Sequence, residues 1–132
     1  MDKPRIKIAD SQFIHTGENS SFGSGDLSFS PNYFSWYRGS ENINDLVVIT
    51  ESMFHIVDSF TEKHKVALII ESPLSNPSAY EFIRKPENYT KFEYILTFSR
   101  DLIQIDPNRF KYYFFGGCWI YPEDRKIYDK TK

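Results

Sequence analysis

The chain has 132 residues, a length typical of one domain, so the sequence predicts a single folded unit. Sixteen Lys and Arg residues against eighteen Asp and Glu residues leave a formal charge of -2, which provides no basic field for binding nucleic acid. Hydrophobic residues make up 40% of the chain and aromatic residues 17%, a composition that favours a folded core over disorder.

Cysteine content and hydropathy indicate the compartment. The single Cys118 cannot form an internal disulfide, which fits a reducing environment and excludes a cysteine-rich zinc site. No apolar run approaches the roughly 20 residues needed to span a bilayer, and residues 1–4 lack the apolar core of a signal peptide. The sequence therefore predicts a cytoplasmic protein without a transmembrane segment.

The first third of the chain reads as one short strand and a long loop. Residues 6–9 alternate between apolar and polar side chains, which predicts a strand at or near the edge of a sheet. Residues 17–45 collect Gly, Ser and Asn together with many aromatic side chains, which predicts a long aromatic loop. Short strands could also lie within it, because loops of this length are uncommon in compact domains.

From residue 46 onward, short apolar runs recur at residues 46–49, 66–70, 94–98 and 112–115. Continuous apolarity is typical of strands buried on both faces, as in a parallel sheet covered by helices. The runs lie far enough apart for a helical crossover between each pair.

The segments between these apolar runs carry either apolar residues at helical spacing or residues that cap helices. Apolar residues from Met53 to Phe60 follow helical spacing and predict the first crossover helix. Asn76 is a good N-cap, Pro77 suits the first helical position, and Pro86 ends a second helix, while Ser99 begins a short third. With right-handed crossovers this order predicts an α/β fold, a Rossmann-like three-layer α/β/α sandwich with a mainly parallel sheet.

Ligands of open parallel sheets bind beyond the carboxyl ends of the strands, so residues after each apolar run are the candidates for chemistry. Glu71 directly follows the most apolar run, where partial burial would raise the pKa of its carboxyl group and suit it to accept a proton. The alternative is that Glu71 caps a helix or pairs with a lysine. Asp10 and Glu51 could join it in a carboxylate cluster, but without the strand order the sequence favours solvated turn positions for both.

The aromatic loop offers a candidate binding surface. Tyr33, Trp36, Tyr37 and Arg38 suit sugar recognition, because flat rings stack on the apolar faces of pyranoses while Arg donates hydrogen bonds to hydroxyls. The alternative is that these rings pack against the protein's own core. No metal-binding spacing and no phosphate-cradling glycine motif appears, so neither a metal nor a cofactor is predicted.

Three stretches of the sequence together resemble a known family. Residues 67–77, 92–100 and 114–120 resemble the amino-terminal half of fucosyltransferase-like glycosyltransferases, especially the viral and bacterial members. The first stretch is a strand that ends in Glu71 with a proline shortly after it, and the second contains the motif Phe92-Glu93-Tyr94. The resemblance covers residues 46–132.

The resemblance implies one half of a GT-B architecture, with residues 1–120 as the Rossmann-like acceptor-side domain and residues 121–132 leading toward a C-terminal donor domain. The implied reaction is an inverting transfer from a GDP-sugar, such as GDP-fucose, to a hydroxyl of an acceptor saccharide. Glu71 matches the family's general base, and Ser72 and Asn76 join the aromatic-loop residues as candidate acceptor-binding residues. The GDP-sugar would bind only with the donor domain, so the chain alone is expected to be inactive.

Two other function classes compete with this one. The first is a stand-alone, non-enzymatic Rossmann-like module that binds a carbohydrate or a protein partner through the aromatic loop. The second, a flavodoxin-like or receiver-like domain, ranks last because the sequence offers neither a convincing acidic phosphoacceptor setting nor a flavin phosphate loop.

Overall fold

The computed structural model describes residues 3–11 and 33–113 of the chain. These residues form one sheet of six parallel strands in the order β2-β1-β3-β4-β5-β6. The strands are β1 (Arg5–Ala9), β2 (Ser35–Tyr37), β3 (Leu46–Thr50), β4 (His64–Leu68), β5 (Tyr94–Thr97) and β6 (Phe110–Tyr112).

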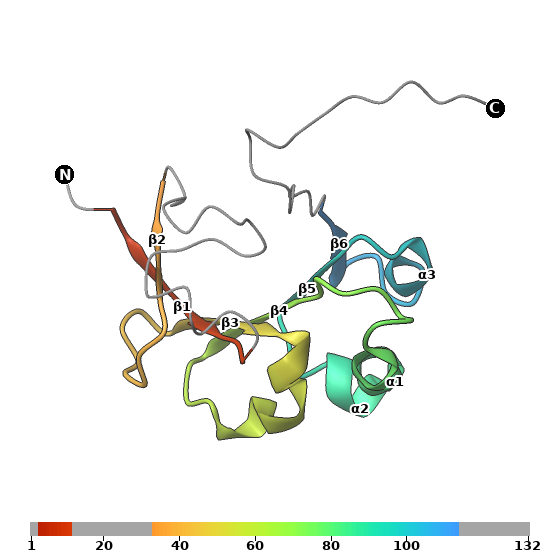
Figure 1. The fold of residues 1–132 in the computed structure, drawn as a ribbon, viewed down its shortest axis with the longest axis horizontal. Coiled ribbons are helices and arrows are strands. Elements are labelled where there is room, and N and C mark those ends of the chain that lie inside the picture. The colour runs from red at the N-terminus through yellow and green to blue at the C-terminus, as the bar shows by residue number, and fades with distance from the viewer. Residues whose placement is uncertain (1–2, 12–32, 114–132) are drawn as a thin grey trace, which may run out of the picture.

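All of the described helices pack against one face of this sheet (Figure 1). They are the 3-10 helix η2 (Glu51–Ser59) and the α-helices α1 (Pro77–Arg84), α2 (Pro86–Tyr89) and α3 (Arg100–Ile103). Every one of them contributes apolar side chains to the same core, which also holds alternate residues of β3, β4 and β5. Because burial of this apolar surface is the main favourable term in folding, this helix-covered face holds most of the fold's stability.

The opposite face of the sheet carries a second, smaller apolar cluster. Its fully buried members are Ile8, Val48, Leu68 and Ile70, and each comes from a strand or the residues just after it. Within the described ranges, 3–11 and 33–113, no helix packs on this face. The all-parallel sheet with flanking helices confirms the predicted α/β, Rossmann-like class.

Several element boundaries differ from the sequence-based expectation. The run predicted at residues 66–70 is β4 at His64–Leu68, and the run predicted at 112–115 begins earlier, as β6. The aromatic loop contains the short edge strand β2, which the sequence pattern had not singled out. Predictions for residues 12–32 and 114–132, including the linker at 121–132, lie outside the described residues.

The first crossover helix is a 3-10 helix rather than an α-helix. Phe54, Val57 and Phe60 recur every three residues, a spacing that also matches the three-residue turn of a 3-10 helix. A non-helical residue inside the element, Ile56, marks a kink. The apolar pattern therefore located the helix correctly but could not separate its two possible periods.

The second crossover helix follows its predicted signals closely. The side chain of Asn76 accepts a hydrogen bond from the backbone N–H of Ala79, and Pro77 occupies the first helical position. The helix ends at Arg84, before Pro86 begins the separate short helix α2. Asn76 therefore fixes where α1 begins, directly after the loop that follows β4.

We expect replacement of Phe54 by alanine to destabilise the fold strongly. Its side chain is 1% exposed, and its ring centroid lies 5.4 Å from that of Phe92 and 6.1 Å from that of Phe82. Loss of a buried phenylalanine leaves a cavity and costs about 3–5 kcal/mol. The free energy of unfolding in urea measures the effect.

The matched control is His55→Ala, because His55 is the next residue along η2 and is exposed. It should change the free energy of unfolding by less than about 0.5 kcal/mol. Equal effects of the two substitutions would show that η2 does not pack on the sheet in this orientation.

Candidate functional site

The strand order places the candidate site at the carboxyl edge of the sheet. The chain leaves β1 for the edge strand β2 and then crosses back to β3 on the other side of β1. This reversal is the topological switch point at which open α/β sheets bind their ligands. Asp10 follows β1 and Glu51 follows β3 at this point, and Glu71 lies beyond the end of the next strand, β4.

A buried carboxylate holds the chain where it leaves β4. Glu51 is 4% exposed, and its carboxylate accepts hydrogen bonds from the backbone N–H groups of Ile70 (3.0 and 3.1 Å) and Glu71 (2.6 Å). Strands β3 and β4 end together at the Thr50–Leu68 pair, so no residue of β3 is left to accept the N–H of Ile70. The Glu51 carboxylate replaces the missing strand and satisfies both donors.

Two tyrosine hydroxyls hold the same segment through its carbonyl groups. The Tyr80 hydroxyl of α1 donates to the carbonyl of Glu71 over 2.9 Å, and the Tyr113 hydroxyl donates to the carbonyl of Ile69 over 2.6 Å. Tyr80 belongs to the core on the helix-covered face and Tyr113 packs against the cluster on the opposite face. The loop that carries Glu71 is therefore held from both faces of the sheet, an arrangement called the β4 clamp below.

The pKa values of the clamp residues follow from their burial. Burial raises the pKa of Glu51 above its ordinary value, and the negative charge of Glu71 adds to this effect. Burial likewise raises the pKa of Tyr80 and of Tyr113, so both hydroxyls keep their protons and remain donors at neutral pH.

The side chain of Glu71 takes no part in the β4 clamp. Its carboxylate is partly exposed, and only its backbone N–H and carbonyl take part in the contacts described above. Among residues 3–11 and 33–113, the Glu71 carboxylate has no hydrogen-bond or ion-pair partner, so it neither caps a helix nor pairs with a lysine there. The backbone of Glu71 is thus held in place, while its carboxylate has no partner among the described residues.

Asp10 and Glu51, the other candidate carboxylates, contact different partners and do not form a cluster with Glu71. Asp10 accepts a hydrogen bond from Nε of Arg38 over 3.0 Å, in an ion pair whose side chains are at most 10% exposed. Glu51 faces the end of β4 instead. In the part of the chain that the structure describes, no group of three or more His, Cys, Asp or Glu side chains could hold a metal ion.

The candidate residues of the aromatic loop lie in different environments. Tyr33 is 85% exposed, whereas Tyr37 is buried beneath Arg5, whose guanidinium lies 4.1 Å from its ring centroid. Trp36 packs against the smaller apolar cluster, with its ring in edge contact with Phe34. Of the four predicted residues, Tyr33 presents a free aromatic face, and Arg38 faces a pocket described below.

Ser72 and Asn76 shape the loop after Glu71. The Ser72 hydroxyl lies 3.2 Å from that of Ser75, and the Ser72 carbonyl accepts the backbone N–H groups of Ser75 and Asn76. The side-chain oxygen of Asn76 caps α1 and also borders a hollow of about 350 Å³ between η2 and α1. Both residues therefore make the turn rigid, and Asn76 also lines a space that a small ligand could enter.

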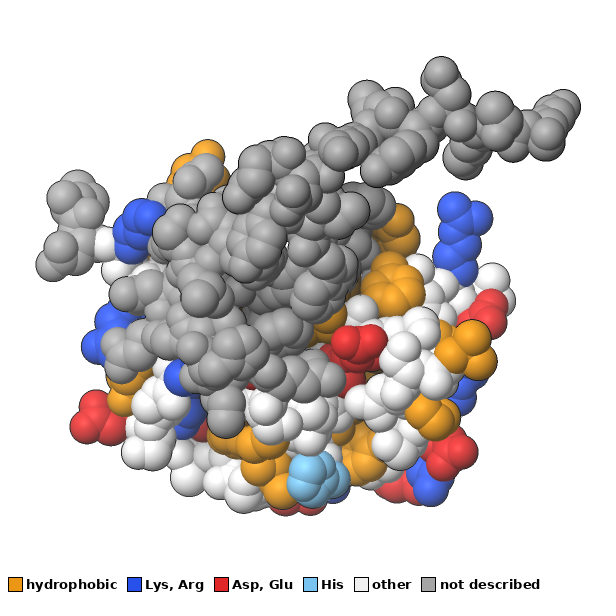
Figure 2. Space-filling view, in the orientation of Figure 1, with side chains coloured by type: hydrophobic (Ala, Val, Ile, Leu, Met, Phe, Trp, Pro, Cys, Tyr) orange, Lys and Arg blue, Asp and Glu red, His pale blue; other side chains and the backbone are white. Residues whose placement is uncertain are grey.

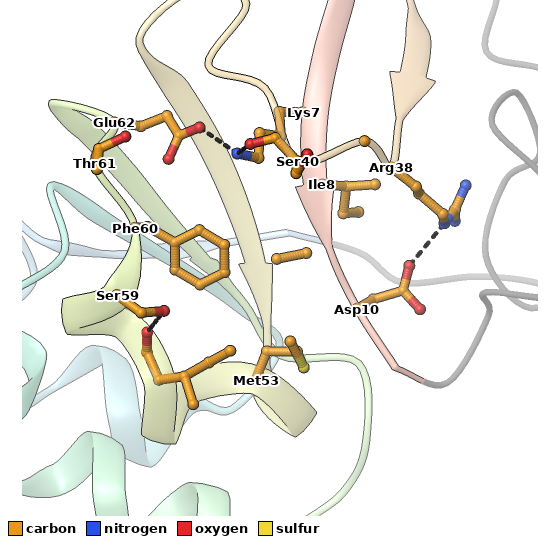
Figure 3. Close-up of a pocket in the computed structure, with 13 residues that line it drawn as sticks. Lys7, Ile8, Asp10, Arg38, Ser40, Met53, Ser59, Phe60, Thr61 and Glu62 are labelled. Atoms are coloured by element: carbon orange, nitrogen blue, oxygen red, sulfur yellow. Dashed lines mark hydrogen bonds and ion pairs between the residues drawn. The ribbon is translucent and has the colours of Figure 1, made fainter.

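A larger pocket of about 480 Å³ lies beside β1 on the helix-covered face of the sheet, and it is called the β1 pocket below (Figure 3). Two buried ion pairs line it: Arg38–Asp10, and Lys7–Glu62 with 2.5 Å between Nζ and Oε1. The apolar part of its lining comes from β1 and η2, with the Phe60 ring beside the Lys7–Glu62 pair in Figure 3.

Several of these residues could not be identified from the sequence. Lys7 occupies a polar position of an alternating strand, which predicted a solvated side chain, yet it is 6% exposed. Glu62 follows η2 and carries no motif, and Phe60 was predicted only as part of the apolar face of that helix. Tyr80 and Tyr113 read as core aromatics, and nothing local indicated that their hydroxyls meet at one loop.

Comparison with known proteins gives no support for any family. No protein-family model, no curated protein and no solved structure matches the chain at a significant level. Within residues 3–11 and 33–113, no helix combines the length and the apolar character that crossing a membrane requires.

The raised pKa of Glu51 predicts a particular dependence of stability on pH. The folded chain binds this proton more tightly than the unfolded chain does, so the contribution is full below the ordinary value of 4.5 and is lost as the pH rises through the raised pKa. Glu51→Gln removes the titrating group. We therefore expect a smaller fall in the free energy of unfolding above pH 4.5 in the variant than in the wild type.

Urea unfolding at a series of pH values measures this difference. Glu87→Gln is the control, because Glu87 is an exposed carboxylate on α2 and should leave the pH dependence unchanged. A Glu51→Gln curve parallel to that of the wild type across this range would contradict a buried, titrating Glu51.

Proposed function

We propose that this chain is the acceptor-side domain of a glycosyltransferase that transfers a sugar, with inversion, from a GDP-sugar to a hydroxyl of an acceptor saccharide. In this proposal Glu71 is the general base. The observation that carries it is the Glu71 carboxylate itself, which is unpartnered among the described residues while its backbone is held on both sides by the β4 clamp. The family resemblance of the sequence around Glu71 supplies the reaction class.

The proposed chemistry needs one base on this side of the active site. The acceptor oxygen forms a bond to the anomeric carbon of the donor sugar while the bond from that carbon to the diphosphate oxygen breaks. Glu71 takes the proton of the acceptor hydroxyl as this happens, and the nucleoside diphosphate leaves with its negative charge. Groups of a donor domain would stabilise that charge, so no covalent intermediate on this chain is required.

The β4 clamp suits this role because a general base must reach the proton it accepts. A catalytic carboxylate works within hydrogen-bond distance of the hydroxyl, about 2.6–3.2 Å. A loop held by Glu51, Tyr80 and Tyr113 loses little further entropy when an acceptor binds, since its backbone is already fixed.

The competing proposal is a non-enzymatic module that binds a carbohydrate or a protein. One observation favours it: the β1 pocket is formed by described residues and does not involve Glu71. A binding module would keep its ligand affinity and show no transfer in any setting, which separates the two functions experimentally.

Replacement of Glu71 by glutamine should lower turnover at least 10²-fold in a protein that joins this chain to a donor domain, as expected for loss of a general base. The acceptor's binding constant should change little, because glutamine keeps the size of the side chain. Transfer of labelled sugar from GDP-fucose and other GDP-sugars to a panel of saccharides is the assay.

Glu81→Gln is the matched control, because Glu81 is an exposed carboxylate on α1 with no catalytic role in the proposal. It should leave turnover within about twofold of the wild type. Near-normal turnover of Glu71→Gln would remove Glu71 from the mechanism, and absence of transfer from every GDP-sugar would favour the binding module.

The proposal that this chain binds the acceptor and a donor domain binds the GDP-sugar gives a separate prediction. Isothermal titration of the chain alone should detect acceptor saccharides but no tight binding of GDP-fucose, because the groups that hold the diphosphate are proposed to lie on the donor domain. Tight binding of GDP-fucose by this chain would contradict that division.

A further inference from the structure

The charges that face the β1 pocket are already neutralised within the protein. Lys7 pairs with Glu62, and Arg38 pairs with Asp10, and all four side chains are at most 10% exposed. The Lys7 ammonium also donates to the carbonyl of Ser40 over 3.0 Å. A charged ligand would have to draw one member out of a pair and leave its partner buried without compensation, which is strongly unfavourable.

The same pocket nevertheless offers polar groups to a neutral ligand. The second carboxylate oxygen of Glu62 is buried at the pocket wall and accepts no hydrogen bond from any described residue. Buried polar atoms in native proteins nearly always have a partner, so an unpartnered one at a pocket points to a missing donor. Figure 3 shows this carboxylate above the Phe60 ring, with one of its oxygens directed to Lys7.

The apolar part of the lining complements these polar groups. The ring of Phe60 and the side chains of Met53 and Ile56 form the η2 wall, and Ala9 belongs to β1. A pocket with one apolar wall and several hydrogen-bonding groups suits a ring that is apolar on one face and carries hydroxyls at its edge. A pyranose has that character, and a pocket of about 480 Å³ has room for one sugar ring.

We propose that the β1 pocket binds one uncharged hexopyranose ring, with its apolar face on Phe60 and a hydroxyl donating to the free oxygen of Glu62. This inference goes beyond the proposed function, because it adds a binding site for a neutral sugar whose lining does not include Glu71. Glu62 precedes β4 and Glu71 follows it, so a ring held at Glu62 lies toward the opposite end of that strand from Glu71, and the β1 pocket is a sugar site separate from the proposed base.

The test is a titration of the full chain, labelled with nitrogen-15, with methyl β-galactoside and methyl β-glucoside. Glucuronate, glucose 6-phosphate and glucosamine are the charged probes. We expect saturable shifts of the amide signals of Asp10, Gly39 and Ser40 with at least one neutral sugar, and binding at least tenfold weaker for its charged analogue. No shift at these amides, or equal affinity for the charged probes, would overturn the inference.

Two variants assign the shifts to the pocket. Phe60→Ala should weaken binding about five- to tenfold through loss of the ring contact. Since Phe60 also packs on the core, Ser40→Trp serves as a second variant, because Ser40 is exposed at the pocket and an indole there would block it. Asn108→Trp, at an exposed residue outside the pocket lining, is the control and should bind sugar normally.

The two proposals fail in different ways. Shifts confined to the loop around Ser72 and Asn76 would refute the pocket assignment while leaving Glu71 as the proposed base. Sugar-dependent shifts at the β1 pocket would support it even if a protein that includes a donor domain transfers no sugar, a result that would refute the glycosyltransferase proposal alone.

Discussion

The buried Glu51 carboxylate is the contact on which the candidate site depends. It lies where β3 and β4 both end, and it accepts the backbone N–H groups of Ile70 and Glu71 in the chain that follows β4. Removing these charge-assisted bonds would leave buried donors without partners, a cost of about 1–3 kcal/mol for each. The same contact fixes the direction in which the chain leaves the sheet and therefore where Glu71 lies.

The described residues combine one carboxylate on a held backbone, Glu71, with one pocket beside β1 of the parallel sheet. The helices cover a single face of the described sheet, and η2 both packs the core through Phe54 and supplies the wall of the β1 pocket. The same element therefore contributes both to the core and to the wall of the pocket. On the part of the surface visible in Figure 2, acidic and basic side chains are interspersed rather than gathered in one patch.

The sequence predicted the fold class well because the signals involved are local. Apolar runs, the Asn76 cap and the prolines at 77 and 86 each act over a few residues, and each located a strand or helix correctly within a few positions. The position of Glu71 at a carboxyl end of a strand followed from the same reasoning. Strand order could not be predicted, because pairing depends on contacts between residues far apart in the chain.

The remaining features of the site arise from such distant contacts. Lys7 and Glu62 are 55 positions apart and Tyr113 lies 44 positions from Ile69. A lysine in an alternating strand ordinarily faces water, so its burial becomes visible only when its carboxylate partner is placed beside it. The roles of Tyr80 and Tyr113 were hidden for a related reason, since a tyrosine's apolar ring predicts burial but not the acceptor of its hydroxyl.

A crystal structure of the chain with a bound neutral saccharide would test the central claim most directly. If Glu71 is the base, a hydroxyl of the saccharide lies within about 2.6–3.2 Å of a Glu71 carboxylate oxygen, while Glu51 still accepts the N–H groups of Ile70 and Glu71. A saccharide bound at the carboxyl edge with no hydroxyl near Glu71, or a Glu71 side chain turned to a lysine in its presence, would contradict the account.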